Sequence, residues 1–173
     1  RWPEALVVPM FAAEKSKACR RLLWATEAYP LVFSKAEQAA KAVAQPVDLL
    51  TSSPECQRFS TGTQLGQANT QLRKTRATRE GRKTVMVLIN SIKRTTPRVV
   101  LMEQVAGVAW LHASVLKAQL KALRKRCPEY VWYGKLADAA DLRTPHHRTR
   151  LIVAGTRPSE TASGDAATTV DPA

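Results

Sequence analysis

The chain has 173 residues, of which 45% are hydrophobic and 24% charged, proportions typical of a globular domain large enough to bury its own core. This composition excludes a wholly disordered chain, and the small numbers of Gly (7) and Pro (10) exclude a collagen-like or low-complexity polymer. The 27 Lys and Arg against 14 Asp and Glu give a net charge of +13, which favours a polyanionic partner such as nucleic acid or an acidic membrane face.

Short apolar runs and segments with helical periodicity follow one another along the chain. In order they predict strand 5–8, helix 14–25, strand 47–50, helix 82–92, strand 99–102, helix 113–123, strand 130–133 and strand 151–154. Strands separated by helices favour an α/β fold with a parallel, doubly wound sheet, because parallel neighbours need long crossovers. In such sheets, ligands bind beyond the carboxyl ends of the strands.

Three other segments differ from this pattern. The polar stretch 59–79 is too long for an ordinary connection and predicts a functional loop. Residues 157–173 are small and acidic, which predicts a disordered tail after one domain that spans 1–156. No apolar run reaches the roughly 18 residues of a membrane span, so we expect no membrane partner.

Basic residues are concentrated in the middle of the chain. Ten of them, against Glu80 alone, lie between Arg58 and Arg98. A second basic run at 117–126 falls on a predicted helix. It is most simply a solvated face, with contact to a nucleic-acid backbone as the alternative.

The three cysteines are Cys19, Cys56 and Cys127, widely spaced and without a CxxC pair. This spacing argues against a disulfide framework and against a zinc site, so we expect no metal and a reducing, intracellular compartment.

Chemically useful side chains stand beside several predicted strands. Cys56 follows strand 47–50 and Glu103 follows strand 99–102, while an Arg-x-Arg pair, 148–150, precedes strand 151–154. Taken singly, each has an ordinary structural explanation: a small buried thiol, a solvated carboxylate and a charged rim on an edge strand.

Taken together and in this order, four segments resemble the DNA (cytosine-5) methyltransferase family. Residues 48–60, DLLTSSPECQRFS, resemble its nucleophile motif, and residues 97–108, PRVVLMEQVAGV, its Glu-Asn-Val motif. Residues 140–155, ADLRTPHHRTRLIVAG, are similar to its Gln-x-Arg-x-Arg motif, and residues 11–19, FAAEKSKAC, to the segment whose acidic residue holds the cofactor ribose.

The resemblance implies a Rossmann-like, S-adenosylmethionine-dependent methyltransferase fold and methyl transfer to carbon 5 of a flipped cytosine. It assigns Cys56 as the thiolate that adds to cytosine carbon 6, and Glu103 as the carboxyl group at the N3 side. It places Arg150 at the cytosine carbonyl oxygen and Arg148 at the nucleophile loop or a phosphate.

The resemblance also implies the binding residues and partners. S-adenosylmethionine is the expected cofactor, held by Glu14 and Pro54, and DNA is the expected partner of a monomeric protein in the cytoplasm, nucleoid or nucleus. The expected DNA-binding residues are Gln57, Arg58, Ser60, Arg73, Lys74 and Arg76.

The sequence departs from the family pattern at several points. Glu55 stands before the thiol where the family has proline, and this carboxylate opposes thiolate formation and repels DNA phosphate. Gln104 replaces asparagine, which is expected to loosen the hydrogen bonds that orient the loop. The glycine-rich cofactor turn expected before Trp2 and the recognition segment expected after Gly155 are not present, which predicts a domain truncated at both ends.

Two other hypotheses remain open at this stage. One is a catalytically inactive, basic DNA-binding remnant of such an enzyme. The other is an unrelated cysteine hydrolase that uses Cys56 with His146 or His147.

Overall fold

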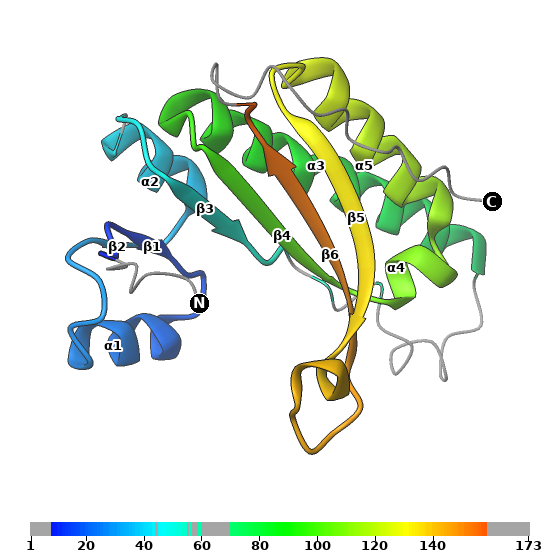
Figure 1. Cartoon of the computed structure of the whole chain (residues 1–173), viewed down its shortest axis with the longest axis horizontal. Coiled ribbons are helices and arrows are strands. Elements are labelled where there is room, and N and C mark those ends of the chain that lie inside the picture. Colours follow the sequence, from blue (N-terminus) through cyan, green and yellow to red (C-terminus); the bar gives the residue numbers. More distant parts are fainter. Residues whose placement is uncertain (1–7, 44, 55, 57–58, 60–69, 159–173) are drawn as a thin grey trace.

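The computed structural model describes residues 8–43, 45–54, 56, 59 and 70–158, with the side chains of 70–77, 80 and 142 outside the description. Two sheets and their helices make up the fold (Figure 1). The elements are β1 (Ala12–Ala13), α1 (Lys17–Ala25), β2 (Val32–Phe33), α2 (Ala36–Ala42), β3 (Leu49–Ser52), α3 (Thr70–Thr95), β4 (Val99–Val105), α4 (Gly107–Trp110), α5 (Ala113–Arg126), β5 (Val131–Asp138), the 3-10 helix η3 (Ala139–Leu142) and β6 (Thr149–Thr156).

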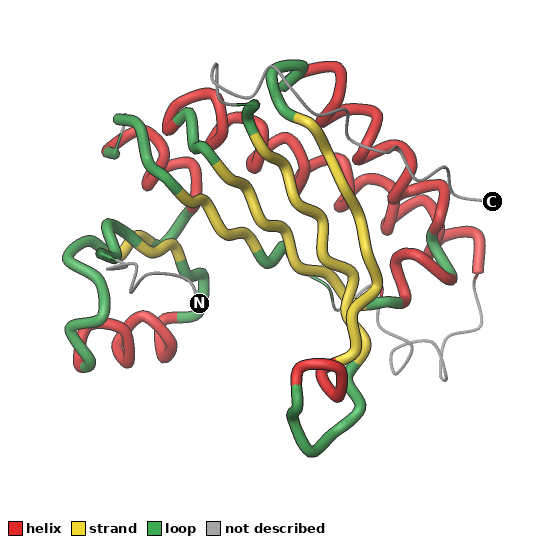
Figure 2. Tube along the Cα trace, viewed as in Figure 1, coloured by secondary structure: helices red, strands yellow, loops and turns green. Residues whose placement is uncertain are grey.

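The large sheet has the strand order β3-β4-β6-β5, which confirms an α/β fold but corrects the prediction of a wholly parallel sheet. The four strands of this sheet lie side by side (Figure 2). β3 and β4 are parallel, whereas β6 runs antiparallel to both β4 and β5 (Figure 1). The physical reason is the short connection 139–148, because a parallel crossover needs about a dozen residues or more. The amino end of β6 therefore lies at the same edge as the carboxyl ends of the other strands.

The helix α3 begins much earlier than predicted, and this corrects the part of the expected loop 59–79 that lies at 70–79. Residues 70–79 are helical, and 60–69 lie outside the described residues. Arg, Lys, Gln and Ala favour helix, and a helix that is already formed extends at one hydrogen bond per residue even without an apolar stripe.

The first part of the chain forms a small parallel sheet, β1-β2, at one side of the large sheet (Figure 1). The predicted helix 14–25 begins only at Lys17, because Ser16 is its N-cap and accepts a hydrogen bond from the backbone N–H of Cys19. Of the predicted strand 5–8, residues 5–7 lie outside the described residues and Val8 is not in a strand. Neither β2 nor the alanine-rich α2 was predicted.

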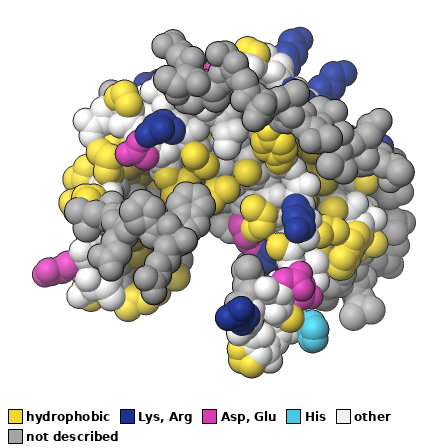
Figure 3. Space-filling view, in the orientation of Figure 1, with side chains coloured by type: hydrophobic (Ala, Val, Ile, Leu, Met, Phe, Trp, Pro, Cys, Tyr) yellow, Lys and Arg dark blue, Asp and Glu magenta, His cyan; other side chains and the backbone are white. Residues whose placement is uncertain are grey.

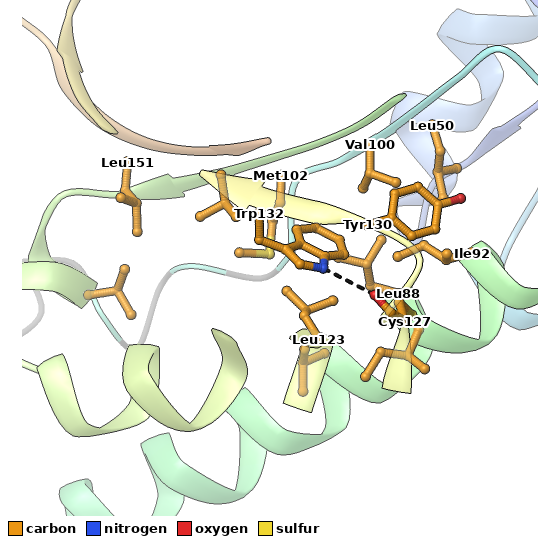
Figure 4. Packing of buried hydrophobic residues seen from close by; sticks show 14 of the residues in the cluster. Leu50, Leu88, Ile92, Val100, Met102, Leu123, Cys127, Tyr130, Trp132 and Leu151 are labelled. Atoms are coloured by element: carbon orange, nitrogen blue, oxygen red, sulfur yellow. Dashed lines mark hydrogen bonds between the residues drawn. The ribbon is translucent and has the colours of Figure 1, made fainter. Parts of the chain in front are cut away.

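The core lies between the large sheet and the helices α3 and α5. Side chains from one face of the sheet meet apolar side chains of both helices (Figure 4). The principal members are Leu50, Val100, Trp132 and Val153 from the sheet, and Leu88, Ile92 and Leu123 from the helices. The Trp132 indole N–H donates to the carbonyl of Cys127 at 3.4 Å, which satisfies the one polar atom of the largest core ring.

The opposite face of the large sheet, which we call the outer face, is partly apolar and open to solvent. Leu49 of β3, Leu101 of β4 and Tyr133 of β5 lie on this face and are 47%, 36% and 49% exposed. Hydrophobic side chains gather there in Figure 3. None of the helices among the described residues is long and apolar enough to cross a bilayer.

Candidate active site

The site is built at the edge where β3 and β4 end. The backbone leaves β3 at Ser52 and continues through Ser53 and Pro54 towards Cys56, which is half-buried. Parallel pairing sets Ser52 opposite Met102, so Ser53 lies beside Glu103, two residues before the end of β4. Two sequence segments fifty residues apart therefore meet at one edge of the sheet.

Two side-chain hydrogen bonds tie the loop before Cys56 to β4. The Ser53 hydroxyl donates to Oε2 of Glu103 at 2.5 Å, and Nε2 of Gln104 donates to the carbonyl of Pro54 at 3.1 Å. Consecutive residues of a strand point to opposite faces of the sheet. Glu103 on the outer face and Gln104 on the core face therefore hold the loop from both sides.

Gln104, the residue expected to loosen the hydrogen bonds of the loop before Cys56, keeps one hydrogen bond to it. Its side chain is buried, with 1% of the residue exposed. Its Oε1 has no hydrogen-bond partner in the part of the chain that the structure describes, which leaves out residues 55, 57 and 58 of the adjoining loop. One hydrogen bond to Pro54 thus orients this amide.

Arg150 completes the arrangement from β6. Its Nε lies 2.8 Å from Oε1 of Glu103, and the two side chains are 26% and 35% exposed. The contact depends on strand direction, because the register pairs Arg150 with Val105 at the end of β4. In a parallel sheet a residue that begins a strand would lie at the opposite edge. Both carboxylate oxygens of Glu103 are thus held, one by Arg150 and one by Ser53.

Arg148 is not brought to Glu103 in the same way. Its backbone N–H donates to Oδ1 of Asp138 at 3.1 Å, and its side chain is exposed. Asp138 also accepts from the backbone N–H of Ala140 and the hydroxyl of Thr149, and lies 3.6 Å from Nδ1 of His147. The hydrogen bond from Ala140 is the main cause that lowers the pKa of Asp138 from its usual value. Asp138 therefore anchors the loop 139–148 at both of its ends.

The histidines of the hydrolase hypothesis lie in this loop. His146 and His147 are both exposed, and Nδ1 of His147 lies 3.6 Å from Oδ2 of Asp138. Among the described residues no set of three or more His, Cys, Asp or Glu is placed to hold a metal ion. The described contacts therefore give no support to a Cys56–His pair.

Of the two predicted cofactor residues, Glu14 follows β1 in the small sheet. One carboxylate oxygen, Oε1, accepts from the backbone N–H of Ser16 at 2.6 Å, and the carbonyl of Glu14 accepts from Arg20 at 2.8 Å. No described residue bonds its Oε2, which suits a carboxylate that accepts from a ribose hydroxyl. The carbonyl of Pro54, by contrast, is already engaged by Gln104.

The predicted DNA-binding residues are only partly covered by the structure. Gln57, Arg58 and Ser60 lie outside the described residues, as does Glu55. Arg73, Lys74 and Arg76 lie in the first turns of α3, and their side chains are outside the description.

Two structural residues of the site were not identified from the sequence. Ser53 lies inside the segment 48–60 without any local sign of its contact, since its partner Glu103 is fifty residues away. Asp138 ends β5, and a carboxylate at a strand end next to a short connection was the one available signal.

Comparison with known proteins assigns the family. A sequence model of the C-5 cytosine-specific DNA methylase family matches residues 3–171. The chain belongs to this family. The predicted family resemblance is thereby confirmed, whereas a search of curated protein sequences found no match.

Solved structures confirm the predicted Rossmann-like methyltransferase fold. The chain is similar to the Entamoeba histolytica methyltransferase EhMeth (TM-score 0.59, 11% identity), covering 88% of this chain and 46% of that one. It is similar to a protein described as a DNA modification methyltransferase of an E. coli prophage (TM-score 0.60, 16% identity, 86% and 40% covered). It is also similar to the S. pombe Dnmt2 methyltransferase (TM-score 0.54, 15% identity, 87% and 42% covered). The chain thus spans less than half the length of these structures.

Proposed function

We propose that this chain carries catalytic residues of a DNA (cytosine-5) methyltransferase, acting on a flipped cytosine of intracellular DNA. The observation that carries the proposal is Glu103, held by Ser53 and Arg150 at the edge where the loop to Cys56 leaves the sheet. Membership of the C-5 cytosine-specific DNA methylase family supports this assignment.

The proposed cofactor is S-adenosylmethionine, which supplies the methyl group. Glu14 is the residue that would hold its ribose, because the Ser16 N–H fixes one carboxylate oxygen and the other suits a hydroxyl donor. Pro54 would contribute apolar contact from its ring, since its carbonyl already accepts from Gln104. Glu14 and Pro54 follow parallel strands of the two sheets, at strand ends where α/β folds bind ligands.

In the proposed reaction the thiolate of Cys56 forms a bond to carbon 6 of cytosine. The displaced electron pair moves towards N3 and carbon 5, and Glu103 donates a proton to N3 while Arg150 donates to the carbonyl oxygen. The methyl group would then pass to carbon 5, and the donor would leave as the neutral thioether S-adenosylhomocysteine. Loss of the carbon 5 proton to a base, with return of the N3 proton to Glu103, lets the C–S bond break, which restores the ring and the thiolate.

Ser53 suits the two protonation states that Glu103 must adopt. A serine hydroxyl can donate to Oε2 of Glu103 in both states, which leaves the other carboxylate oxygen to carry the proton for N3. The 2.5 Å contact therefore orients Glu103 before and after it transfers a proton. Arg148, which is exposed beside the site, would contact DNA phosphate.

The second candidate function is a basic DNA-binding protein that has lost catalysis. Glu55, directly before Cys56, favours it, because a neighbouring carboxylate opposes thiolate formation and repels phosphate. The net charge of +13 would then serve DNA binding alone.

Covalent trapping tests the proposal. Duplex DNA with 5-fluorocytosine retains the adduct after methyl transfer, because fluorine cannot leave as the proton does. We expect the full chain with S-adenosylmethionine to form a denaturation-resistant complex that Cys56→Ser abolishes and Cys19→Ser, a change at an exposed cysteine of α1, preserves. An adduct that still forms in Cys56→Ser refutes the assignment of Cys56 as the nucleophile.

The variant Glu55→Pro separates the two candidates. An increased adduct yield in this variant supports the methyltransferase, since only a reacting thiol profits from removal of the carboxylate. Salt-sensitive DNA binding without adduct, in both the native chain and Glu55→Pro, supports the inactive DNA-binding protein.

A further inference from the structure

A row of basic side chains runs along one face of α5. Lys117, Lys121, Arg124 and Lys125 recur at helical spacing and are all exposed, and we call these four residues the α5 basic stripe. The opposite face buries Val115, Gln119 and Leu123 against the core. The stripe is therefore fixed in direction by the packing of the helix.

Charge repulsion within the stripe is not compensated inside the helix. Like charges four residues apart destabilise a helix, and the stripe has such pairs at Lys117/Lys121 and Lys121/Lys125. The sequence of α5 contains no acidic residue. Among the described residues, no ion pair involves any of the four side chains.

Helix-end electrostatics account for only part of the stripe. Arg124 and Lys125 lie in the last turn, where cations complement the helix dipole. Lys117 and Lys121 lie before the last turn and gain nothing from that effect. An anion outside the described chain would relieve their repulsion.

The stripe belongs to a wider basic layer made by α3 and α5. The two helices touch at Gly81, where Nε2 of Gln119 donates to the Gly81 carbonyl at 3.0 Å. Exposed Arg82 and Lys83 of α3 follow this contact directly. Since both helices cover the core face of the sheet, their exposed sides together form one solvent-facing layer on that side of the molecule (Figure 1).

The position of the stripe differs from that of the candidate active site. α5 begins after α4, at the edge where β4 ends, and runs to the edge where β5 begins. From Lys117 to Lys125 the helix rises by about 12 Å. Along this distance duplex DNA presents about seven phosphate charges.

We propose that the α5 basic stripe binds the phosphate backbone of duplex DNA, away from the target base. The choice of DNA as the ligand rests on the proposed function, in which DNA is the substrate. Lysine and arginine side chains donate without accepting, which matches phosphate oxygens and carries no base preference. The stripe adds a second contact to the one expected around Cys56.

The test compares two variants with equal charge loss. The stripe variant carries Lys117→Gln, Lys121→Gln, Arg124→Gln and Lys125→Gln, because glutamine keeps the helix propensity. The control neutralises four exposed basic residues of the first part of the chain: Lys17→Gln, Arg21→Gln, Lys35→Gln and Lys41→Gln. The ligand is a duplex of A·T pairs alone, so that no cytosine can enter the active site.

Affinity is measured between 50 and 200 mM salt, because each neutralised phosphate contributes about 0.9 to the slope of log K against log salt. We expect the stripe variant to lose about 2 to 4 from this slope and the control less than about 1. An unchanged slope in the stripe variant, or an equal loss in the control, overturns the proposal. The slope is independent of adduct formation, so failure of the proposed methyl transfer leaves this result readable.

Two further measurements complete the experiment. The stripe variant should unfold at the same or a higher temperature than the native chain, since its repulsion is removed; a lower temperature would attribute the binding loss to misfolding and overturn the proposal. Vesicles of phosphatidylcholine with phosphatidylserine test a membrane partner. Vesicle binding that depends on the stripe, with duplex binding unaffected, also overturns it.

Discussion

The ion pair between Glu103 and Arg150 is predicted to couple the ends of β4 and β6. A charge-assisted hydrogen bond contributes about 1.5–3 kcal/mol when it is well shielded. Here Nε and Oε1 are 2.8 Å apart, but the side chains are 26% and 35% exposed, so water screens part of the interaction. We therefore expect a coupling energy of about 1 kcal/mol between the two residues.

A double-mutant cycle measures this energy. Glu103→Gln and Arg150→Met remove the charges with little change of shape, and urea unfolding of the native chain, both single variants and the double variant gives the coupling. Arg98 and Asp48 provide the control, since they lie 3.7 Å apart with side chains 77% and 90% exposed. That pair should couple by at most a few tenths of a kcal/mol. Coupling at Glu103–Arg150 that is no larger than in the control would refute the predicted coupling between the ends of β4 and β6.

Three further predictions concern packing and protonation. A Cβ at Gly81 would lie 2.5 Å from Cγ1 of Val115, so in Gly81→Ala an overpacking cost of about 1–3 kcal/mol should exceed the gain in helix propensity of about 1 kcal/mol. Val115→Ala should recover stability in that background, whereas a single variant more stable than the native chain contradicts the reasoning. Burial raises the pKa of Cys127 from 9.0 to about 11, so as the pH rises this thiol ionises in the unfolded chain before it does so in the folded chain. The free energy of unfolding should therefore fall between pH 9 and 11 by up to about 1.4 kcal/mol per pH unit. Cys127→Ala should flatten this decline, and an unchanged slope would count against it. Because folding lowers the pKa of Asp138, the stabilisation from this carboxylate is present above pH 3.8 and is lost as the pH falls through its pKa in the folded chain. Asp138→Asn should therefore speed amide exchange in residues 139–148. Equal exchange in the exposed control Asp141→Asn would contradict the anchoring role.

Strong local patterns predicted the elements of the large sheet. The predicted strands 99–102 and 151–154 lie within β4 and β6, and the predicted strands 47–50 and 130–133 overlap β3 and β5, because each strand carries apolar residues toward the core. Weak patterns were missed: β1 and β2 have two residues each, and the alanine-rich α2 has no apolar stripe. Helical order in residues 70–79 was also missed, because polar helix formers resemble a polar loop when no periodicity distinguishes them.

The candidate site was predicted one residue at a time, and its assembly was only partly visible. Cys56, Glu103 and Arg150 were identified from their motifs and from the rule that ligands bind at strand ends. The rule for a parallel sheet would have put Arg150 at the wrong edge. The antiparallel direction of β6 brings it to Glu103, and the short connection 139–148 is the cause.

The sequence by itself determined the family, the excess of positive charge and most of the strands, because motif order, composition and hydrophobic period are local properties of the chain. Only the tertiary structure decided that Ser53 holds Glu103, that Gln104 holds Pro54 and that the backbone N–H of Arg148 donates to Asp138. The contacts of Ser53 and Gln104 join residues fifty positions apart. Strand order and register create such contacts, and neither leaves a mark in the local sequence.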